Sequence, residues 1–345
     1  MSDVTVRQIG EFGLIAALQE ALPPEVKAGP ALEIGIGDDC AVWRPPEGES
    51  VVVTTDSLVE GVHFRVDWTS WERLGHKTLA VNLSDLASMG AAPGIAVITL
   101  ALTGRERIMD LIFFYRGLGA LAKTAGTLIA GGDIVASPNA TAFHVAALGS
   151  TRGGKMLLRS GARPGDVIAV SGTLGASAAG LEILRSGPGD HRRATATGPL
   201  LIDQHLAPQP RLALGEILLR EGASAAMDLS DGLYGDLSKI LVASGVSARV
   251  DEAAIPVAAA VRAHFPTDWL KLATRGGEDY ELLFTAPPGV FRHIQAAADE
   301  IGATVTEIGE VTEGEKHDLI AVDADGAQRK VASGAFDHFH RPPTG

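Results

Sequence analysis

The sequence has a single cysteine, Cys40, among its 345 residues. One thiol excludes a disulfide within the chain and agrees with a reducing compartment. Long apolar runs are also missing, because the longest, residues 95–102, is far shorter than the roughly 20 residues that a membrane-spanning helix needs. The amino terminus has acidic residues where a signal peptide has a basic and then an apolar segment. We therefore expect a cytoplasmic protein without a membrane partner.

Positive charge is scarce as well, since the formal net charge is −13 at pH 7. Nucleic acids and anionic membrane surfaces require a cationic face, so the sequence disfavours both as partners. The same charge constrains any phosphate ligand. A site lined by carboxylates would repel a phosphate compound unless bound cations intervened.

The length and the alternating pattern favour two domains, because 345 residues exceed what one core usually supports. Expected helices cover 7–22, 71–89, 107–125, 175–184, 210–220 and 233–243, and a polar loop is expected at 187–198. Expected strands cover 32–36, 51–55, 95–102, 127–130, 141–148, 167–170, 246–250, 280–284 and 304–309. The periodic pattern of apolar residues is interrupted at 151–155, which makes this segment a candidate domain boundary. Because helices and strands alternate on both sides of it, we expect two α/β or α+β domains, at 1–150 and 151–345.

Short acidic clusters recur where an apolar run gives way to glycine or a turn. They are Gly37-Asp38-Asp39, Thr54-Thr55-Asp56, Asn82-Leu83-Ser84-Asp85, Gly131-Gly132-Asp133, Asp228-Leu229-Ser230-Asp231, Asp236 and Gly276-Gly277-Glu278-Asp279. Any one of these acids alone is more often a turn former or a helix cap than a ligand. Together, carboxylates and hydroxyls without thiols suit hard divalent cations such as Mg²⁺. The pattern predicts magnesium held against an anionic ligand.

Familiar nucleotide signatures are absent from the sequence. Gly154-Lys155 is followed by Met156 and lacks the glycine spacing of a P-loop. The segment 117–122 formally fits a dinucleotide fingerprint, but it lies inside a helical pattern with no strand before it. Any nucleotide must therefore be held in another way.

Other candidate residues stay open when only the residues are considered. His63, between apolar neighbours, is either a packed side chain or a ligand contact. Arg159 is either a phosphate clamp or an ion pair. Asn82 and Asp85 are spaced to share one face of a helix, which is either a ligand face or a solvated one.

In chain order, the motifs resemble those of the thiamine-monophosphate kinase family over nearly the whole chain. They are the segments 35–39, 54–56, 61–64, 82–90, 131–133, 228–232, 276–282 and 336–339. The resemblance implies the two-domain fold of the aminoimidazole ribonucleotide synthetase superfamily, with an N-terminal domain that dimerises through its sheet. It also implies transfer of the γ-phosphoryl group of ATP to thiamine monophosphate, with several Mg²⁺ ions, as the last step of thiamine diphosphate biosynthesis.

The resemblance assigns roles to individual residues. The implied metal ligands are Asp39, Thr54, Thr55, Asp56, Asp85, Asp133, Asp228 and Asp231. The implied ATP contacts are Tyr115, Gly132, Asp133, Arg159 and Ser230, and the implied substrate contacts are His63, Glu278 and Phe336. Asp56, Asp133 and Arg159 are the expected catalytic residues. Alternatives are an aminoimidazole ribonucleotide synthetase, a selenophosphate synthetase or a non-catalytic Mg-nucleotide-binding regulator.

Overall fold

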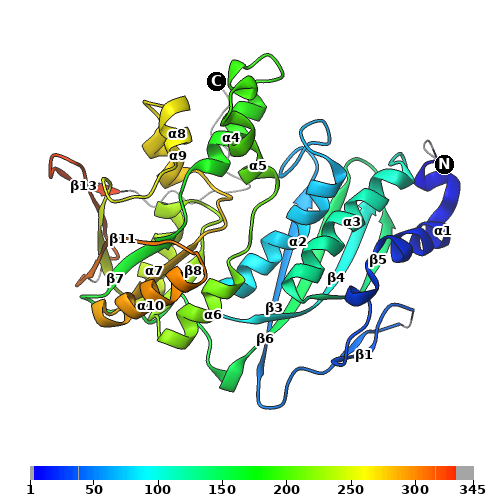
Figure 1. The fold of residues 1–345 in the computed structure, drawn as a ribbon, viewed down its shortest axis with the longest axis horizontal. Helices are drawn as coiled ribbons and strands as arrows, with labels where there is room; N and C mark the ends of the chain where they lie inside the picture. The colour runs from blue at the N-terminus through cyan, green and yellow to red at the C-terminus, as the bar shows by residue number, and fades with distance from the viewer. Residues whose placement is uncertain (1–3, 38, 315, 332–345) are drawn as a thin grey trace. The chain divides into compact units, whose positions relative to one another are not determined.

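The computed structural model describes residues 4–37, 39–314 and 316–331 (Figure 1). By its internal contacts the chain divides into two compact units. The first comprises Met1–Leu86 and Ala91–Lys155, and the second comprises Ala87–Gly90 and Met156–Gly345. Among the described residues, no helix is both long and apolar enough to cross a membrane.

The first unit is built on a four-stranded sheet with the order β3-β6-β4-β5. Its strands are β3 (Ser50–Val59), β4 (Ala92–Leu102), β5 (Leu128–Ala136) and β6 (Ala142–Thr151), and a small separate sheet pairs β1 (Leu32–Ile34) with β2 (Val42–Trp43). The helices are α1 (Val6–Ala21), α2 (Trp71–Ser88) and α3 (Ile108–Ala125), with short 3₁₀ turns at Pro24–Val26 and Arg152–Gly154.

One face of this sheet is covered by helices and the other is more open. Phe114 of α3 stacks on Phe143 of β6, with ring centroids 4.3 Å apart. Phe143 and Val145 on β6 are fully buried, as alternation along a half-covered strand requires. On β3 the opposite positions are open to solvent, with Val51 at 47% and Val53 at 63% exposure.

The second unit contains a seven-stranded sheet with the order β13-β12-β9-β11-β7-β10-β8. Its strands are β7 (Val167–Ser171), β8 (Ala225–Asp228), β9 (Ser247–Asp251), β10 (Leu282–Ala286), β11 (Val305–Thr312), β12 (Leu319–Val322) and β13 (Gln328–Val331). Only the pairing of β12 with β9 is parallel among the described strands of this sheet.

Helices pack on both faces of this second sheet. They are α4 (Ala176–Arg185), α5 (Gly198–Leu206), α6 (Leu212–Glu221), α7 (Leu233–Ser244), α8 (Ala259–His264), α9 (Trp269–Arg275) and α10 (Pro288–Glu300). Alternate residues of β7 enter two cores: Ile168 and Val170 join the core beneath α7, whereas Val167 and Ala169 join the core with α6 and α10. A third, smaller core links α4, α5, α8 and α9.

The structure confirms the expected two-domain mixed α/β class and corrects several local expectations. The strands expected at 51–55 and 127–130 extend to Val59 and Ala136, so Asp56 and Asp133 lie inside strands and not after them. Both are edge strands of their sheet. Some of their exposed positions carry polar residues, so the apolar alternation expected of a strand is interrupted. The loop expected at 187–198 contains a 3₁₀ turn, His191–Ala194. The elements α5, α8, α9, α10, β2, β8, β12 and β13 were not predicted.

Candidate functional site

On the helix-covered side of the first sheet, strand β3 and helix α2 bring two predicted metal ligands together. The hydroxyl of Thr54 donates a hydrogen bond of 2.5 Å to Oδ2 of Asp85. Asp56 follows on the same side of β3, because it pairs with buried Val145. Asn82, one turn before Asp85, is fully buried, which rules out the solvated-face interpretation of this pair.

The opposite side of the sheet carries a pocket of about 410 Å³ lined by residues 35–37 and 39–41 and by strands β4 and β5. Asp39 and Gly132 both line it, together with Thr99. Asp133 pairs with Thr99 in register, so its side chain leaves the sheet on this side. A Cβ at Gly132 would lie 2.1 Å from the backbone oxygen of Ile98, so only glycine fits there.

Other residues predicted in the first unit have more local surroundings. The Thr55 hydroxyl donates to the carbonyl of Val145 at 2.9 Å. Nδ1 of His63 accepts the amide of Val59 at 3.1 Å, so a neutral ring carries its proton on Nε2. Tyr115 lies in the core on α3, only 9% exposed, and burial raises the pKa of its phenol.

In the second unit, two acidic segments far apart in sequence lie side by side. The amide of Glu278 donates to the carbonyl of Ser230 at 2.9 Å, and the amide of Tyr280 donates to Leu229 at 2.9 Å. These bonds continue the antiparallel pairing of β8 with β10, in which Asp228 stands opposite Leu282. A predicted ATP contact, Ser230, is therefore adjacent to a predicted substrate contact, Glu278.

Asp231 begins a compact ion-pair network at the start of α7. Nζ of Lys239 contacts Asp231 Oδ2 at 2.6 Å and Asp236 Oδ1 at 2.7 Å. Asp236 also accepts the amide of Asp231 at 2.9 Å. Burial raises the pKa of Asp236 despite its lysine partner. Burial opposes ionisation of Lys239, but its hydrogen bonds to the two aspartates raise its pKa overall. Part of the charge of Asp231 is thus already balanced by Lys239.

Arg159 is exposed on the segment that precedes β7. Its backbone is fixed there, because the Ser244 hydroxyl donates to the Arg159 carbonyl at 3.1 Å. The neighbouring Leu158 carbonyl accepts the amide of Ala226 on β8 at 2.9 Å. Phe336, the remaining predicted substrate contact, lies outside the described residues.

Sequence reasoning missed His205, which lies beside Glu278. Its Nδ1 is 3.1 Å from Oε2 of Glu278, and 3.0 Å from the hydroxyl of Ser177. The signal for this contact was weak, because a lone histidine near the end of an unpredicted helix has no motif around it. The pairing became visible only with the fold.

The neighbouring Asp279 caps helix α4. Its carboxyl group accepts the amides of Gly175 at 2.7 Å and Ser177 at 3.1 Å. Burial raises the pKa of Asp279 to about 7, against the opposing effect of these two amide hydrogen bonds. Asp279 therefore serves the helix start and is not placed as an open ligand.

Within the described residues, no group of three or more His, Cys, Asp or Glu side chains is arranged to hold a metal ion. The structure shows pairs of oxygen donors, such as Thr54 with Asp85, and donors on both sides of the first sheet. The convergence of all the acidic clusters on one site stays a prediction.

The sequence of each unit matches a known domain family. Residues 37–151 match the AIR synthase related protein, N-terminal domain, and residues 163–322 match the AIR synthase related protein, C-terminal domain. Fold and sequence together define the class as an AIR synthase related protein with both domains.

Full-length relatives narrow this class. The chain is 40% identical to thiamine-monophosphate kinase of Salmonella typhimurium over 339 residues, 96% of this chain and 99% of the relative. The crystal structure of thiamine-monophosphate kinase from Stenotrophomonas maltophilia K279a matches with a TM-score of 0.81 and 37% identity, covering 92% of this chain and 97% of that one. A structure of AaThiL complexed with AMPPCP and TMP matches with a TM-score of 0.75 and 32% identity, covering 96% and 98%. The chain belongs to the thiamine-monophosphate kinase family.

Proposed function

We propose that the protein transfers the γ-phosphoryl group of ATP to thiamine monophosphate in the cytoplasm, giving thiamine diphosphate and ADP as the last step of thiamine diphosphate biosynthesis. The observation that carries this proposal is the 40% identity to a thiamine-monophosphate kinase over 96% of the chain. The likeness to a protein complexed with AMPPCP and TMP supports the same pair of substrates.

Magnesium ions fit the donor chemistry of the first unit. Thr54, Asp85 and Asp56 offer hard oxygen atoms on one side of the sheet, and Asp39 and Asp133 do so on the other. We assign these residues, with Thr55, Asp228 and Asp231, to metal binding. Bound Mg²⁺ would neutralise phosphate charge and favour in-line transfer. Lys239 limits the net negative charge that Asp231 can contribute.

We assign ATP contacts to Gly132, Asp133, Arg159, Ser230 and Tyr115. Gly132 lets a ligand approach the backbone of β5 closely, since it has no side chain. Arg159 is exposed and can present its planar fork to phosphate oxygens. Tyr115 is the weakest member by position, because it is buried in the core on α3.

We assign substrate contacts to His63, Glu278 and Phe336. Glu278 carries a negative charge suited to the permanent cation of a thiazolium ring, and its side chain is 23% exposed. His63 can donate from Nε2 when Nδ1 accepts the amide of Val59. In this arrangement the N-terminal domain, 1–150, binds ATP and metal, and residues 151–345 complete the site.

The reaction requires no general base from the chain. The attacking atom is a phosphate oxygen of the substrate, which is already ionised at neutral pH. Asp279, whose pKa is raised to about 7, is engaged by the amides of Gly175 and Ser177 and is not aimed at a substrate. Asp56 and Asp133 would hold Mg²⁺, and Arg159 would contact the phosphate oxygens. Because the attacking group is the substrate phosphate itself, we propose direct transfer without a phosphoenzyme.

We also propose a homodimer formed through the sheet of the first unit. The open face of edge strand β3 exposes Val51 and Val53 by 47% and 63%. Neighbouring exposed apolar side chains on one face of a sheet mark a candidate interaction surface. Sedimentation at several protein concentrations tests this assembly, and a monomer at all of them would refute it.

ADP release measured with thiamine monophosphate, with thiamine and with neither tests the function. We expect ADP release that depends strictly on thiamine monophosphate and yields thiamine diphosphate in equal amount. Release that proceeds without it would favour another ATP-using enzyme of the superfamily. Binding of ATP without any release would favour a regulator.

A further inference from the structure

His205 lies near the carboxyl end of helix α5 and is nearly inaccessible, at 4% exposure. Its Nδ1 faces two oxygen atoms, Glu278 Oε2 at 3.1 Å and Ser177 Oγ at 3.0 Å. Glu278 is more open, with its side chain 23% exposed. The buried histidine therefore contacts Glu278 while part of the Glu278 side chain stays accessible.

The hydrogen-bond chemistry fixes which atom donates. An ionised carboxylate only accepts hydrogen bonds, so the contact with Glu278 requires a proton on Nδ1 of His205. The hydroxyl of Ser177 can accept from the same N–H or donate elsewhere. A histidine lacking the Nδ1 proton would set a lone pair against the carboxylate. His205 thus acts here as a donor at Nδ1.

The backbone around Glu278 is held independently of its side chain. Glu278 and Tyr280 have positive φ angles of 66° and 51°, a conformation that residues with side chains seldom adopt. Asp279 between them is anchored to the start of α4 through Gly175 and Ser177. The strained segment is therefore pinned at its centre, and only the side chain of Glu278 remains to be oriented.

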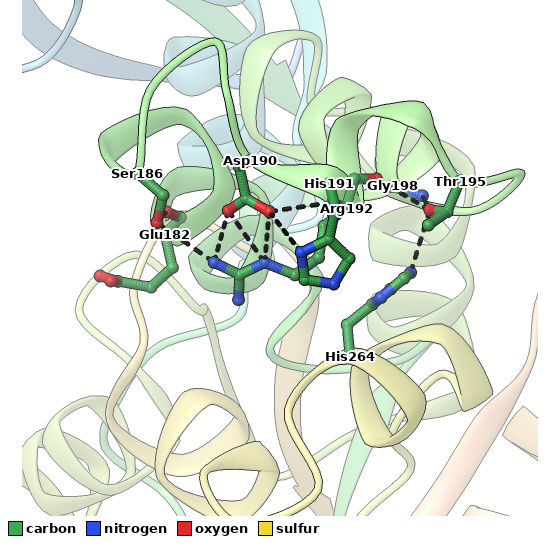
Figure 2. A network of polar contacts seen from close by, with 8 residues as sticks. All are labelled: Glu182, Ser186, Asp190, His191, Arg192, Thr195, Gly198 and His264. Carbon is green, nitrogen blue, oxygen red and sulfur yellow. Dashed lines mark hydrogen bonds and ion pairs between the residues drawn. The ribbon is translucent and has the colours of Figure 1, made fainter.

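Helix α5, which carries His205, is itself braced. A Cβ at Gly180 of α4 would lie 2.1 Å from the backbone oxygen of Leu201, so the two helices touch backbone to backbone. Figure 2 shows the loop before α5, in which the hydroxyl of Thr195 accepts the amide of Gly198 at 2.9 Å and lies 3.3 Å from Nε2 of His264. The polar loop expected at 187–198 thus fixes the beginning of α5 through its hydrogen bonds.

The same loop is closed by an arginine fork. Asp190 accepts hydrogen bonds from Nε of Arg192 at 2.9 Å, and these bonds lower the pKa of the Asp190 carboxyl (Figure 2). The Arg192 guanidinium also lies over the ring of Phe265, 4.6 Å from its centroid. These contacts leave α5 little freedom, so His205 is held at a fixed place.

We propose that His205 is a positioning residue that orients the carboxylate of Glu278 for recognition of a cationic substrate. The proposal rests on the proposed function, in which Glu278 contacts thiamine monophosphate. Asp279 sets the backbone of the segment, and the Nδ1–H of His205 selects one orientation of the Glu278 side chain. A preorganised carboxylate binds its partner without first losing side-chain freedom.

Two polar variants of His205 separate positioning from packing. The amide nitrogen of asparagine can take the place of Nδ1, whereas that of glutamine lies nearer the place of Nε2. We expect His205→Gln to raise KM for thiamine monophosphate about tenfold, with kcat and KM for ATP little changed. For His205→Asn, KM for thiamine monophosphate should stay within about threefold of the wild-type value. His293→Gln, at an exposed position on α10, is the matched control.

A double variant tests whether His205 acts through Glu278. Glu278→Ala should raise KM for thiamine monophosphate, and adding His205→Gln should raise it no further, because the histidine acts through the carboxylate. The inference would be overturned if the effects of Glu278→Ala and His205→Gln on KM for thiamine monophosphate multiplied in the double variant. Equal increases of this KM in His205→Gln and His205→Asn would also overturn it. So would a change confined to thermal stability.

The outcomes also separate this inference from the function on which it rests. A wild type that releases no ADP with thiamine monophosphate overturns both. An active wild type with an unchanged KM in His205→Gln overturns the inference alone. An unchanged KM in Glu278→Ala removes the role of Glu278, and the positioning role with it. Circular dichroism of each variant confirms that it is folded.

Discussion

The buried carboxyl group of Asp279 makes stability depend on pH in a direction that can be tested by replacing it with asparagine. Burial raises its pKa from 3.8 to about 7, although the amides of Gly175 and Ser177 favour the ionised form. In the unfolded chain the group ionises above its ordinary pKa, whereas in the folded protein it stays protonated until about pH 7. Its contribution to stability is therefore complete below pH 4 and is lost as the pH rises to 7.

The shift of about three pKa units corresponds to roughly 4 kcal/mol in the free energy of unfolding. Asparagine cannot ionise, so Asp279→Asn lacks this pH-dependent loss. Asparagine also presents an amide group to one of the two backbone donors, which lowers stability at every pH. The difference in free energy of unfolding, wild type minus variant, should fall by roughly 3 kcal/mol between pH 5 and pH 8.

Urea unfolding at pH 5, 6, 7 and 8, followed by circular dichroism, measures this difference. Subtracting the variant from the wild type cancels the titration of groups that do not interact with Asp279. Asp299→Asn, at an exposed position on α10, is the matched control and should show a nearly constant difference. A difference for Asp279→Asn that stays flat or grows with pH would refute the reasoning. It would mean that the amides of α4 outweigh burial and keep the carboxylate ionised.

Three further substitutions test the packing and the proposed metal ligands. Gly180→Ala should lower the free energy of unfolding by about 2 kcal/mol in urea titrations, because its Cβ would lie 2.1 Å from a backbone oxygen of α5; unchanged stability would contradict this close approach. Asp56→Asn should reduce kcat at least about 100-fold in the ADP-release assay, with Asp325→Asn as the exposed control; near-normal turnover would remove its metal role. Lys239→Met should cost on the order of 3 kcal/mol in urea unfolding, since it leaves Asp231 without its cation; no loss would show that the network is not stabilising.

Local sequence signals predicted the long elements of the core well. The apolar spacing of α2, α3 and β4 produced helices and a strand close to their expected limits. These elements bury side chains at regular intervals, so their period is visible in the sequence. The edge strands β3 and β5 were predicted too short, because half-exposed strands mix polar and apolar residues on both faces.

The helices around the third core were the main omission. Helices α8 and α9 have 6 and 7 residues, too few to display a full helical period. Helix α5 follows directly on a polar loop whose hydrogen bonds, such as Thr195 to Gly198, fix its start. With α5 unseen, no reading of the sequence could place His205 beside Glu278.

In the candidate site, too, some contacts have a signal in the sequence and others depend on the fold. The adjacency of Ser230 and Glu278 follows from the antiparallel pairing of β8 with β10, which joins segments distant in sequence. Lys239, by contrast, left a sequence signal, because it lies on α7 at a helical spacing from Asp236. The resemblance to a known family named the site residues, and the fold supplied their partners.

The acidic run from Glu278 to Glu281 shows why composition alone could not assign roles. In the sequence it is a run of three carboxylates, of which Glu278 and Asp279 belong to one of the acidic clusters. In the structure each meets a different partner: Glu278 meets His205, Asp279 meets the amides at the start of α4, and Glu281 accepts Nε of Arg211 at 2.8 Å. A carboxylate bound to an arginine or to a helix start has its charge or its lone pairs already engaged. Of the three, Glu278 alone contacts a histidine and has a side chain that is 23% exposed, which suits contact with a cationic ligand.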